Sequence, residues 1–269
     1  MRACQTELVA GGIVPELIVR VPDAWASVKI APLYDVHIGH RNHDAEKFAR
    51  HLEWIKRTKN VLTFNGGDLI ENASKLSVGA GVYEQILTPQ EQIEAAVAQV
   101  KGACDGKMLF SLPGNHEDRT ELMGVSVGRW IAQALGVPYF PDFCFCTLMW
   151  RGNRFRILAH HGSGGAGTPG GQRNAARKAV AWAKPVDVFW TGHLHNPLVD
   201  ILWQTDFDQR TGASVERSAL VIISPSYLKY FGSYAAKKQY SPGLRGLSVI
   251  ELQADGRIDV SIHANGRRL

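Results

Sequence analysis

Residues 107–117 read KMLFSLPGNHE, a short apolar run that stops at a Pro-Gly pair and continues into an amide, an imidazole and a carboxylate. A run of this length and composition predicts a buried strand, which the Pro-Gly pair ends. Two earlier stretches follow the same design, since residues 27–33 (SVKIAPL) precede Asp35 and residues 61–64 (VLTF) precede Asp68. Side chains that can bind metals therefore follow predicted strands repeatedly in the first half of the chain.

Segments with helical spacing separate these strands. Apolar residues recur at intervals of three or four in residues 44–59, 89–100 and 125–135, the second opening with Pro89 and the third closing at Gly136. Pro in the first turn and Gly after the last turn are typical helix boundaries. The alternation of strands and helices predicts βα units.

The second half of the chain is richer in strands. Residues 143–150 and 154–160 flank an Arg-Gly-Asn turn and predict a hairpin. A helix with a basic face is expected over residues 172–183. Further strands are expected over residues 186–190, 197–203, 218–223, 246–252 and 257–262.

βα units followed by strand-rich sequence predict a four-layer α/β/β/α sandwich of two mixed sheets flanked by helices. A chain of 269 residues can form one domain of this size. We therefore expect a single domain over residues 1–269, with residues 1–26 as an added hairpin or edge segment.

Composition is ordinary for a globular protein, with 45% hydrophobic and 20% charged residues, which excludes disordered and fibrous classes. No apolar run approaches the roughly 18–20 residues that span a bilayer, and residues 1–21 lack the pattern of a signal peptide, so a cytoplasmic protein without membrane contact is expected. The four cysteines are too few and too irregularly spaced for a disulfide framework or a CxxC zinc site. The net charge of +5 favours an anionic partner.

Five short blocks combine a metal-capable side chain with a tight turn. They are Asp35-Val36-His37, Gly67-Asp68, Gly114-Asn115-His116-Glu117, His161-Gly162 and Gly192-His193-Leu194-His195. Each follows a predicted strand, and ligands of α/β sheets bind at the carboxyl ends of strands, so we expect these side chains to meet. Carboxylate, amide and imidazole donors without a thiolate suit Mn, Fe, Zn or Ni better than a structural zinc site.

The blocks and their order resemble the calcineurin-like metallophosphoesterase family, whose D-x-H, G-D, G-N-H-[D/E], H and G-H-x-H motifs all occur between residues 30 and 196. The Gly-rich run at residues 161–171 also resembles stretches of phage- and prophage-encoded members. The resemblance implies ligands for two divalent cations, with Mn favoured over Fe, Zn or Ni. The implied ligands are Asp35, His37 and His195 on one metal, Asn115, His161 and His193 on the other, and Asp68 between them.

The resemblance also implies a reaction, in which hydroxide from a water that bridges the two metals attacks a phosphoester. His116 is implied to be the catalytic histidine that contacts the phosphoryl group or protonates the leaving oxygen. Glu71 matches the position of its acidic partner, although relatives often carry Asp there. We interpret Glu117 as a residue that fixes the turn or orients a ligand.

The remaining histidines receive no catalytic role. His161 rather than His160 is chosen as a ligand because it directly precedes Gly162, as the H-G pattern requires, and His160 is left as a core residue or a support for a ligand. We expect His40 and His43 on a loop, and His51 on an exposed helix face.

Three segments are candidates for substrate contact. Residues 71–88 follow Asp68 and could overhang the site, although a plain surface insertion is the alternative. Residues 226–245 mix aromatic with basic side chains, as proteins that bind single-stranded nucleic acid do, and a solvated loop is the alternative. We select Lys229 and Tyr230 from this segment, and Arg173 after the Gly-rich run, where a helix N-terminus could meet an anion.

The sequence thus predicts a hydrolase that favours phosphodiesters of a nucleotide or nucleic acid. A phosphomonoesterase is the first alternative, but the R-G continuation of Ser/Thr protein phosphatases is missing after Asp68, where LIENAS follows. The second alternative is a non-catalytic scaffold with the same fold. The sequence argues against it, because every ligand position is filled. The substrate, the native metal and the oligomeric state are left open.

Overall fold

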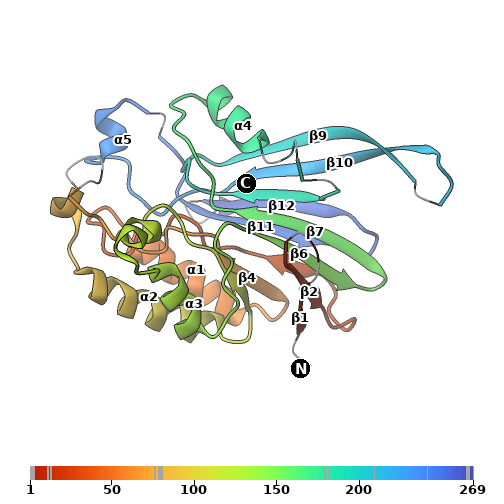
Figure 1. The fold of residues 1–269 in the computed structure, drawn as a ribbon, viewed down its shortest axis with the longest axis horizontal. Coiled ribbons are helices and arrows are strands. Elements are labelled where there is room, and N and C mark those ends of the chain that lie inside the picture. Colours follow the sequence, from red (N-terminus) through yellow and green to blue (C-terminus); the bar gives the residue numbers. More distant parts are fainter. Residues whose placement is uncertain are drawn as a thin grey trace.

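Two facing β-sheets with helices on their outer sides make up the protein (Figure 1). The computed structural model describes residues 4–10, 12, 14–75, 77, 81–178, 180, 182–183, 185–208, 210–240, 242–264 and 267–268. Among the described helices, none combines the length and the apolar character that crossing a membrane requires.

The first sheet has seven strands in the order β1-β2-β6-β7-β8-β10-β9. They are β1 (Gln5–Val9), β2 (Glu16–Arg20), β6 (Phe143–Trp150), β7 (Asn153–His160), β8 (Val188–Thr191), β9 (Leu198–Phe207) and β10 (Ser214–Ile223). The pairs β2/β6, β7/β8 and β8/β10 are parallel, whereas β1/β2, β6/β7 and β9/β10 are antiparallel hairpins. The hairpin β1–β2 therefore adds an edge to the mixed sheet.

The second sheet has six strands in the order β13-β12-β11-β3-β4-β5. They are β3 (Val28–Ile30), β4 (Val61–Asn65), β5 (Met108–Ser111), β11 (Gly246–Leu252), β12 (Ile258–Ala264) and β13 (Arg267–Arg268). The strands β3, β4 and β5 run parallel, so their carboxyl ends lie at one edge. β11 joins β3 antiparallel and makes this sheet mixed as well.

Helices α1 (Ala45–Arg57), α2 (Pro89–Cys104) and α3 (Val127–Leu135) cover the second sheet, and α4 (Pro169–Arg177) covers the first (Figure 1). The chain also forms the short helix α5 (Tyr234–Lys237) and the 3-10 turns η1 (Gly81–Glu84) and η2 (Glu117–Met123). Thr88 and Glu91 form a capping box at the start of α2, and Gly136 ends α3 in a left-handed conformation. These are the boundaries that the sequence predicts.

Three apolar clusters hold the layers together. The largest lies between the two sheets and includes Trp150, Trp190 and Phe64. A second lies between the second sheet and α1–α3, and a third lies between the first sheet and α4. The order is therefore helices, sheet, sheet, helix, which confirms the predicted α/β/β/α sandwich.

Some predicted boundaries were wrong. The helix expected over residues 172–183 begins at Pro169, because Thr168 caps it by accepting from the backbone N–H of Gly171, and it ends at Arg177. Residues 179 and 181 of that expected range lie outside the described residues. β9 and β10 extend beyond the predicted 197–203 and 218–223, because they continue as a hairpin that projects from the body (Figure 1).

The expectation for His51 was also wrong. Its side chain is half-buried, and its Nδ1 lies 2.8 Å from the Tyr227 hydroxyl group. Tyr227 comes from the segment after β10 and is buried against Phe48 of α1, with ring centroids 5.1 Å apart. This face of α1 is covered by a distant part of the chain, so it is not exposed there.

Candidate metal centre

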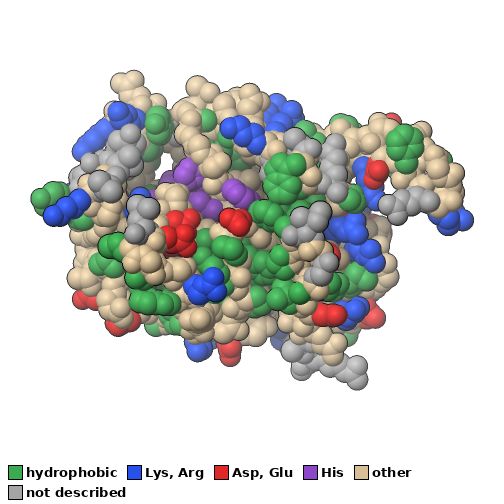
Figure 2. Space-filling model, in the orientation of Figure 1, with side chains coloured by type: hydrophobic (Ala, Val, Ile, Leu, Met, Phe, Trp, Pro, Cys, Tyr) green, Lys and Arg blue, Asp and Glu red, His purple; other side chains and the backbone are tan. Residues whose placement is uncertain are grey.

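The predicted ligand loops lie together at the carboxyl ends of the strands. The loop after β3 runs along the loop after β4, where His37 N–H donates to Asp68 O at 2.9 Å. The loop after β5 joins them, since His116 N–H donates to Asp68 Oδ1 at 2.9 Å. The loops after β7 and β8 are joined by Gly192 N–H, which donates to His161 O at 2.8 Å. Histidine side chains gather here in a hollow beside acidic ones (Figure 2).

A first group of ligand atoms comes from Asp35, His37, Asp68 and His195, all within 4.8 Å of one another. His195 Nε2 lies 3.3 Å from Asp35 Oδ1 and 3.3 Å from His37 Nε2. His37 Nε2 lies 3.9 Å from Asp68 Oδ2. Donor atoms held tetrahedrally at about 2.0–2.1 Å from a cation lie roughly 3.3 Å apart, so this spacing fits a bound ion.

A second group comes from Asp68, His161 and His193. His161 Nε2 lies 3.3 Å from Asp68 Oδ2 and 3.2 Å from Asn115 Oδ1, and His193 Nδ1 lies 2.8 Å from the same amide oxygen. Asp68 belongs to both groups. The structure thus brings all seven predicted ligands together, in the two sets that the family resemblance implies.

Hydrogen bonds orient three of the histidines. A carbonyl or carboxylate oxygen can only accept, so each bond identifies a ring nitrogen that carries hydrogen: Nδ1 of His161 donates to Gly66 O at 3.0 Å, and Nε2 of His193 to Gly164 O at 2.9 Å. Nδ1 of His37 lies 3.0 Å from Glu71 Oε2 and donates to it when that carboxyl group is ionised. In each ring the other nitrogen faces the ligand groups, as in carboxylate–histidine–metal arrangements.

Five of the seven side chains sit on strained backbone. Asp35, His37, Asp68, His193 and His195 have φ angles of 49°, 53°, 53°, 65° and 56°. This left-handed conformation costs a non-glycine residue about 1–2 kcal/mol and persists at functional sites where the surroundings determine it. The fold therefore maintains local strain to aim these side chains at one another.

Glycine is required where the backbone touches a ligand. A Cβ atom on Gly114 would overlap Asp68 Oδ1, and a Cβ atom on Gly192 would overlap Asp35 Oδ2. The glycines in the G-N-H-E and G-H-x-H blocks thus let neighbouring loops approach the carboxylates.

Glu117 anchors two of these loops. Its buried carboxylate accepts from the backbone N–H groups of Asp68 at 2.9 Å, Gly114 at 2.8 Å and Ile70 at 3.1 Å. Burial and the nearby charge of Asp68 raise the pKa of Glu117. These contacts confirm the interpretation that Glu117 fixes the turn.

The charges of the centre depend on one another. Burial alone would raise the pKa of Asp68, but the neighbouring His116, His161 and His37 outweigh it and hold that pKa well below the ordinary value. Burial likewise would lower the pKa of His161, but Asp68 raises it. A site that stabilises a buried carboxylate with positive charge is suited to a cation, whose binding would release the histidine proton.

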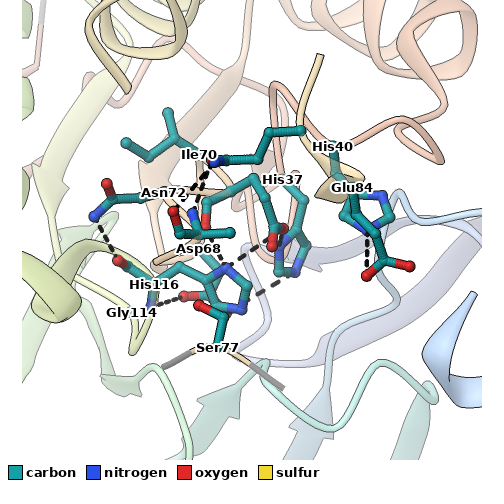
Figure 3. Close-up of polar contacts among 12 residues, drawn as sticks. His37, His40, Asp68, Ile70, Asn72, Ser77, Glu84, Gly114 and His116 are labelled. Carbon is teal, nitrogen blue, oxygen red and sulfur yellow. Dashed lines mark hydrogen bonds and ion pairs between the residues drawn. The ribbon is translucent and has the colours of Figure 1, made fainter. Parts of the chain in front are cut away.

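His116 lies at the edge of the first group, with its side chain 14% exposed and its Nε2 3.7 Å from Asp68 Oδ2 (Figure 3). Its Nδ1 donates to the backbone oxygen of Glu71 at 2.6 Å. The Glu71 carboxylate lies 3.4 Å from His116 Nδ1 but is hydrogen-bonded to His37. Glu71 therefore supports both histidines, one through its carboxylate and the other through its main chain.

The three residues selected for substrate contact have different surroundings. One terminal nitrogen of Arg173 forms an ion pair with Asp200 at 2.9 Å, and the side chain is half-exposed. The Tyr230 hydroxyl group donates to Tyr240 O at 2.7 Å, within its own segment. Lys229 is exposed.

Both candidate substrate segments reach the centre. The segment 226–245 passes against the G-H-x-H loop, because a Cβ atom on Gly243 would overlap His195 O. The segment 71–88 begins at the centre with Glu71 and Asn72, whose side-chain amide donates to His116 O at 2.8 Å (Figure 3). Residues 76, 78–80 and 241 lie outside the described residues.

Sequence reasoning did not select Arg119. One of its terminal nitrogens lies 2.9 Å from His116 Nε2, and the other donates to Glu71 O at 2.8 Å. The available signal was its spacing, because residues three apart on the helical turn η2 share a side.

A scan against models of protein families gives no match, and a search of curated proteins gives none either. Among solved structures, the chain is similar to a metallophosphoesterase from Sphaerobacter thermophilus, with 13% identity, a TM-score of 0.40 and coverage of 90% of this chain and 88% of that one. It is also similar to a candidate diadenosine tetraphosphatase, with 13% identity, a TM-score of 0.34 and coverage of 93% and 99%. These values are too low to specify an activity, which has to be inferred from the residues of the centre.

Proposed function

We propose that this protein is a metal-dependent phosphoester hydrolase of the calcineurin-like type, with residues 1–269 forming one domain. The observation that carries the proposal is the convergence of seven hard or borderline donors in two groups that share Asp68. The orientation of His37, His161 and His193 by their second ring nitrogens supports it, because metal-binding histidines usually have such a partner on the nitrogen that does not bind the metal.

Asp35, His37, Asp68 and His195 would hold one divalent cation, and Asp68, Asn115, His161 and His193 the other. When bound, two such cations polarise phosphoryl oxygens and lower the pKa of water, which supplies a nucleophile at neutral pH. Mn fits this donor set, as do Fe, Zn and Ni. The contribution of the chain is to fix the donors on strained loops before any ligand arrives.

His116 would contact the phosphoryl group and the leaving oxygen through Nε2, since Nδ1 is held by Glu71 O. Burial lowers the pKa of His116 to about 4, and the neighbouring Arg119 contributes to this, so the ring is neutral near pH 7. An anionic phosphoryl group beside Nε2 would raise the pKa of His116. The ring could then be protonated at Nε2 and donate that proton to the leaving oxygen. Glu71 would position the ring.

We favour phosphodiesters of nucleotides or nucleic acid as substrates. The net charge of +5 supports an anionic ligand. The segment 226–245 passes the G-H-x-H loop at Gly243 and carries exposed Lys229 and partly exposed Tyr230. Arg173 would contribute through the part of its guanidinium group that does not pair with Asp200. Aromatic and basic side chains together suit stacked bases and phosphates.

The test is hydrolysis by metal-stripped protein of bis-p-nitrophenyl phosphate and p-nitrophenyl phosphate, with Mn, Ni, Zn, Mg or no metal restored. We expect metal-restored turnover with the diester preferred, and none for Asp68→Asn at the same metal concentration. Monoester preference would contradict the proposed substrate class but keep the reaction. Metal binding without turnover of either ester would oppose the hydrolase assignment and favour a scaffold.

A further inference from the structure

The guanidinium group of Arg119 is in direct contact with His116. One terminal nitrogen lies 2.9 Å from His116 Nε2, whereas the other donates to Glu71 O at 2.8 Å and pairs with the buried Glu71 carboxyl group at 3.6 Å. The side chain is 16% exposed, so it is largely enclosed but not fully buried.

The two contacts of His116 define its hydrogen positions. Its Nδ1 faces the carbonyl oxygen of Glu71 at 2.6 Å and has to donate there. Its Nε2 faces an arginine N–H, which can only donate, so Nε2 is the acceptor. In this arrangement Arg119 donates to His116 Nε2, the nitrogen that would have to face the substrate if His116 is catalytic.

We propose that Arg119 is a phosphoryl-binding residue, which transfers its hydrogen bond from His116 Nε2 to a phosphoryl oxygen when the substrate binds. This inference rests on the proposed function. An anionic oxygen accepts more strongly from a guanidinium group than a neutral ring nitrogen does, so the exchange is favourable. It also frees Nε2 to face the substrate.

The hydrogen bond from Arg119 to Glu71 O can persist while the other terminal nitrogen changes partner. The bond to Glu71 O keeps one terminal nitrogen fixed, so only the other has to change partner. A group held close to its bound position loses little conformational freedom on binding. The guanidinium group would then bring positive charge to the phosphoryl group from the side of His116.

Variants Arg119→Gln and Arg119→Lys test the inference, with Arg41→Gln as the matched control. Arg41 likewise pairs with a buried carboxylate, Glu84, at 3.1 Å, whereas the contact with His116 belongs to Arg119. Calorimetry on Zn-loaded protein measures the affinity for inorganic phosphate, and thermal melting checks folding. Nitrogen-15 NMR of the metal-free protein reports the state of His116 Nε2.

We expect Arg119→Gln to weaken phosphate binding about tenfold or more, and Arg119→Lys to weaken it less, because lysine keeps the charge but not the planar fork. The Nε2 signal of His116 should shift in Arg119→Gln and not in Arg41→Gln. In turnover assays KM should rise in Arg119→Gln and stay unchanged in Arg41→Gln.

Equal phosphate affinity in wild type and Arg119→Gln would overturn the inference. If Arg119→Gln does not fold, unchanged affinity in Arg119→Lys together with an unchanged KM would overturn it as well. A different result would contradict the proposed function: no ester turnover by the metal-loaded wild-type protein. The phosphate-binding measurement would still be valid in that case.

Discussion

Glu117 Oε2 accepts a hydrogen bond at 2.9 Å from the backbone N–H of Asp68, the residue shared by the two ligand groups. The same oxygen accepts from Gly114 N–H at 2.8 Å. One buried carboxylate thus joins the loops after β4 and β5, and their relative position depends on it. The metal centre and the stability of the fold are therefore coupled at this residue.

Glu117→Gln should lower the free energy of unfolding by roughly 2–3 kcal/mol, because an amide cannot accept from all three N–H groups and brings its own donors toward them. Urea unfolding of the metal-free protein measures this, with wild type and variant compared at the same pH. Glu53→Gln is the control, since Glu53 is an exposed i,i+4 partner of Arg57 worth about 0.5 kcal/mol or less. Coincident unfolding curves for wild type and Glu117→Gln would refute the coupling.

Gly114→Ala should reduce metal affinity about tenfold or more and lower the melting temperature, because the new methyl group would displace the Asp68 carboxylate. Gly102→Ala is the matched control, since a Cβ atom there meets nothing within 4 Å and the residue is in helix α2. That variant should keep its metal affinity and gain up to about 1 kcal/mol of stability. Equal metal affinity in the two variants would disprove the steric argument.

His51 makes the metal-free protein sensitive to acid. Burial, assisted by the nearby His263 and Lys47, lowers the pKa of His51 to about 4, below the value of about 6.5 in the unfolded chain. The unfolded state therefore takes up the proton first as the pH falls. Stability from His51 is complete above about pH 6.5 and is lost between there and pH 4, by roughly 2–3 kcal/mol in all.

His51→Gln tests this pH dependence, because glutamine can still bond the Tyr227 hydroxyl group but does not titrate. Melting temperatures in a chelator should fall less steeply between pH 6.5 and pH 4.5 in the variant than in wild type. Other buried histidines affect the pH dependence of both proteins equally, so the difference between the two slopes reports on His51 alone. Parallel curves would mean that His51 has the same pKa in the folded and unfolded states, which would contradict the account.

The layered fold and the meeting of the ligand loops could be predicted from the sequence because both depend on local patterns. Strands such as residues 61–64 are short apolar runs that end at a turn, and the turn carries the ligand Asp68. Since parallel strands place their carboxyl ends at one edge, position in the chain translates directly into position in space.

Contacts that depend on distant segments could not be predicted in the same way. His51 was expected to be exposed because its neighbours on α1 give no sign of Tyr227, which lies 176 positions away. Arg119 was missed because nothing in the sequence says that an arginine beside the G-N-H-E block points at His116 and not at solvent. The bond from Glu71 to His37 likewise needs coordinates, since both His37 and His116 were within reach of it.

The start of α4 is a different case, because its signal was present in the sequence. Thr168 followed by Pro169 is a capping residue before proline in the first turn, but the surrounding glycines favoured a loop. The capping signal outweighed the glycine content.

The most direct test of the central claim is the number of Mn ions bound per chain after equilibrium dialysis, measured for wild type, Asp68→Asn and His116→Ala. The account predicts two ions for wild type, fewer than one for Asp68→Asn, and two for His116→Ala with turnover reduced about a hundredfold or more. No bound metal in wild type, or equal loss in both variants, would contradict a two-metal centre that shares Asp68 and leaves His116 free for the substrate.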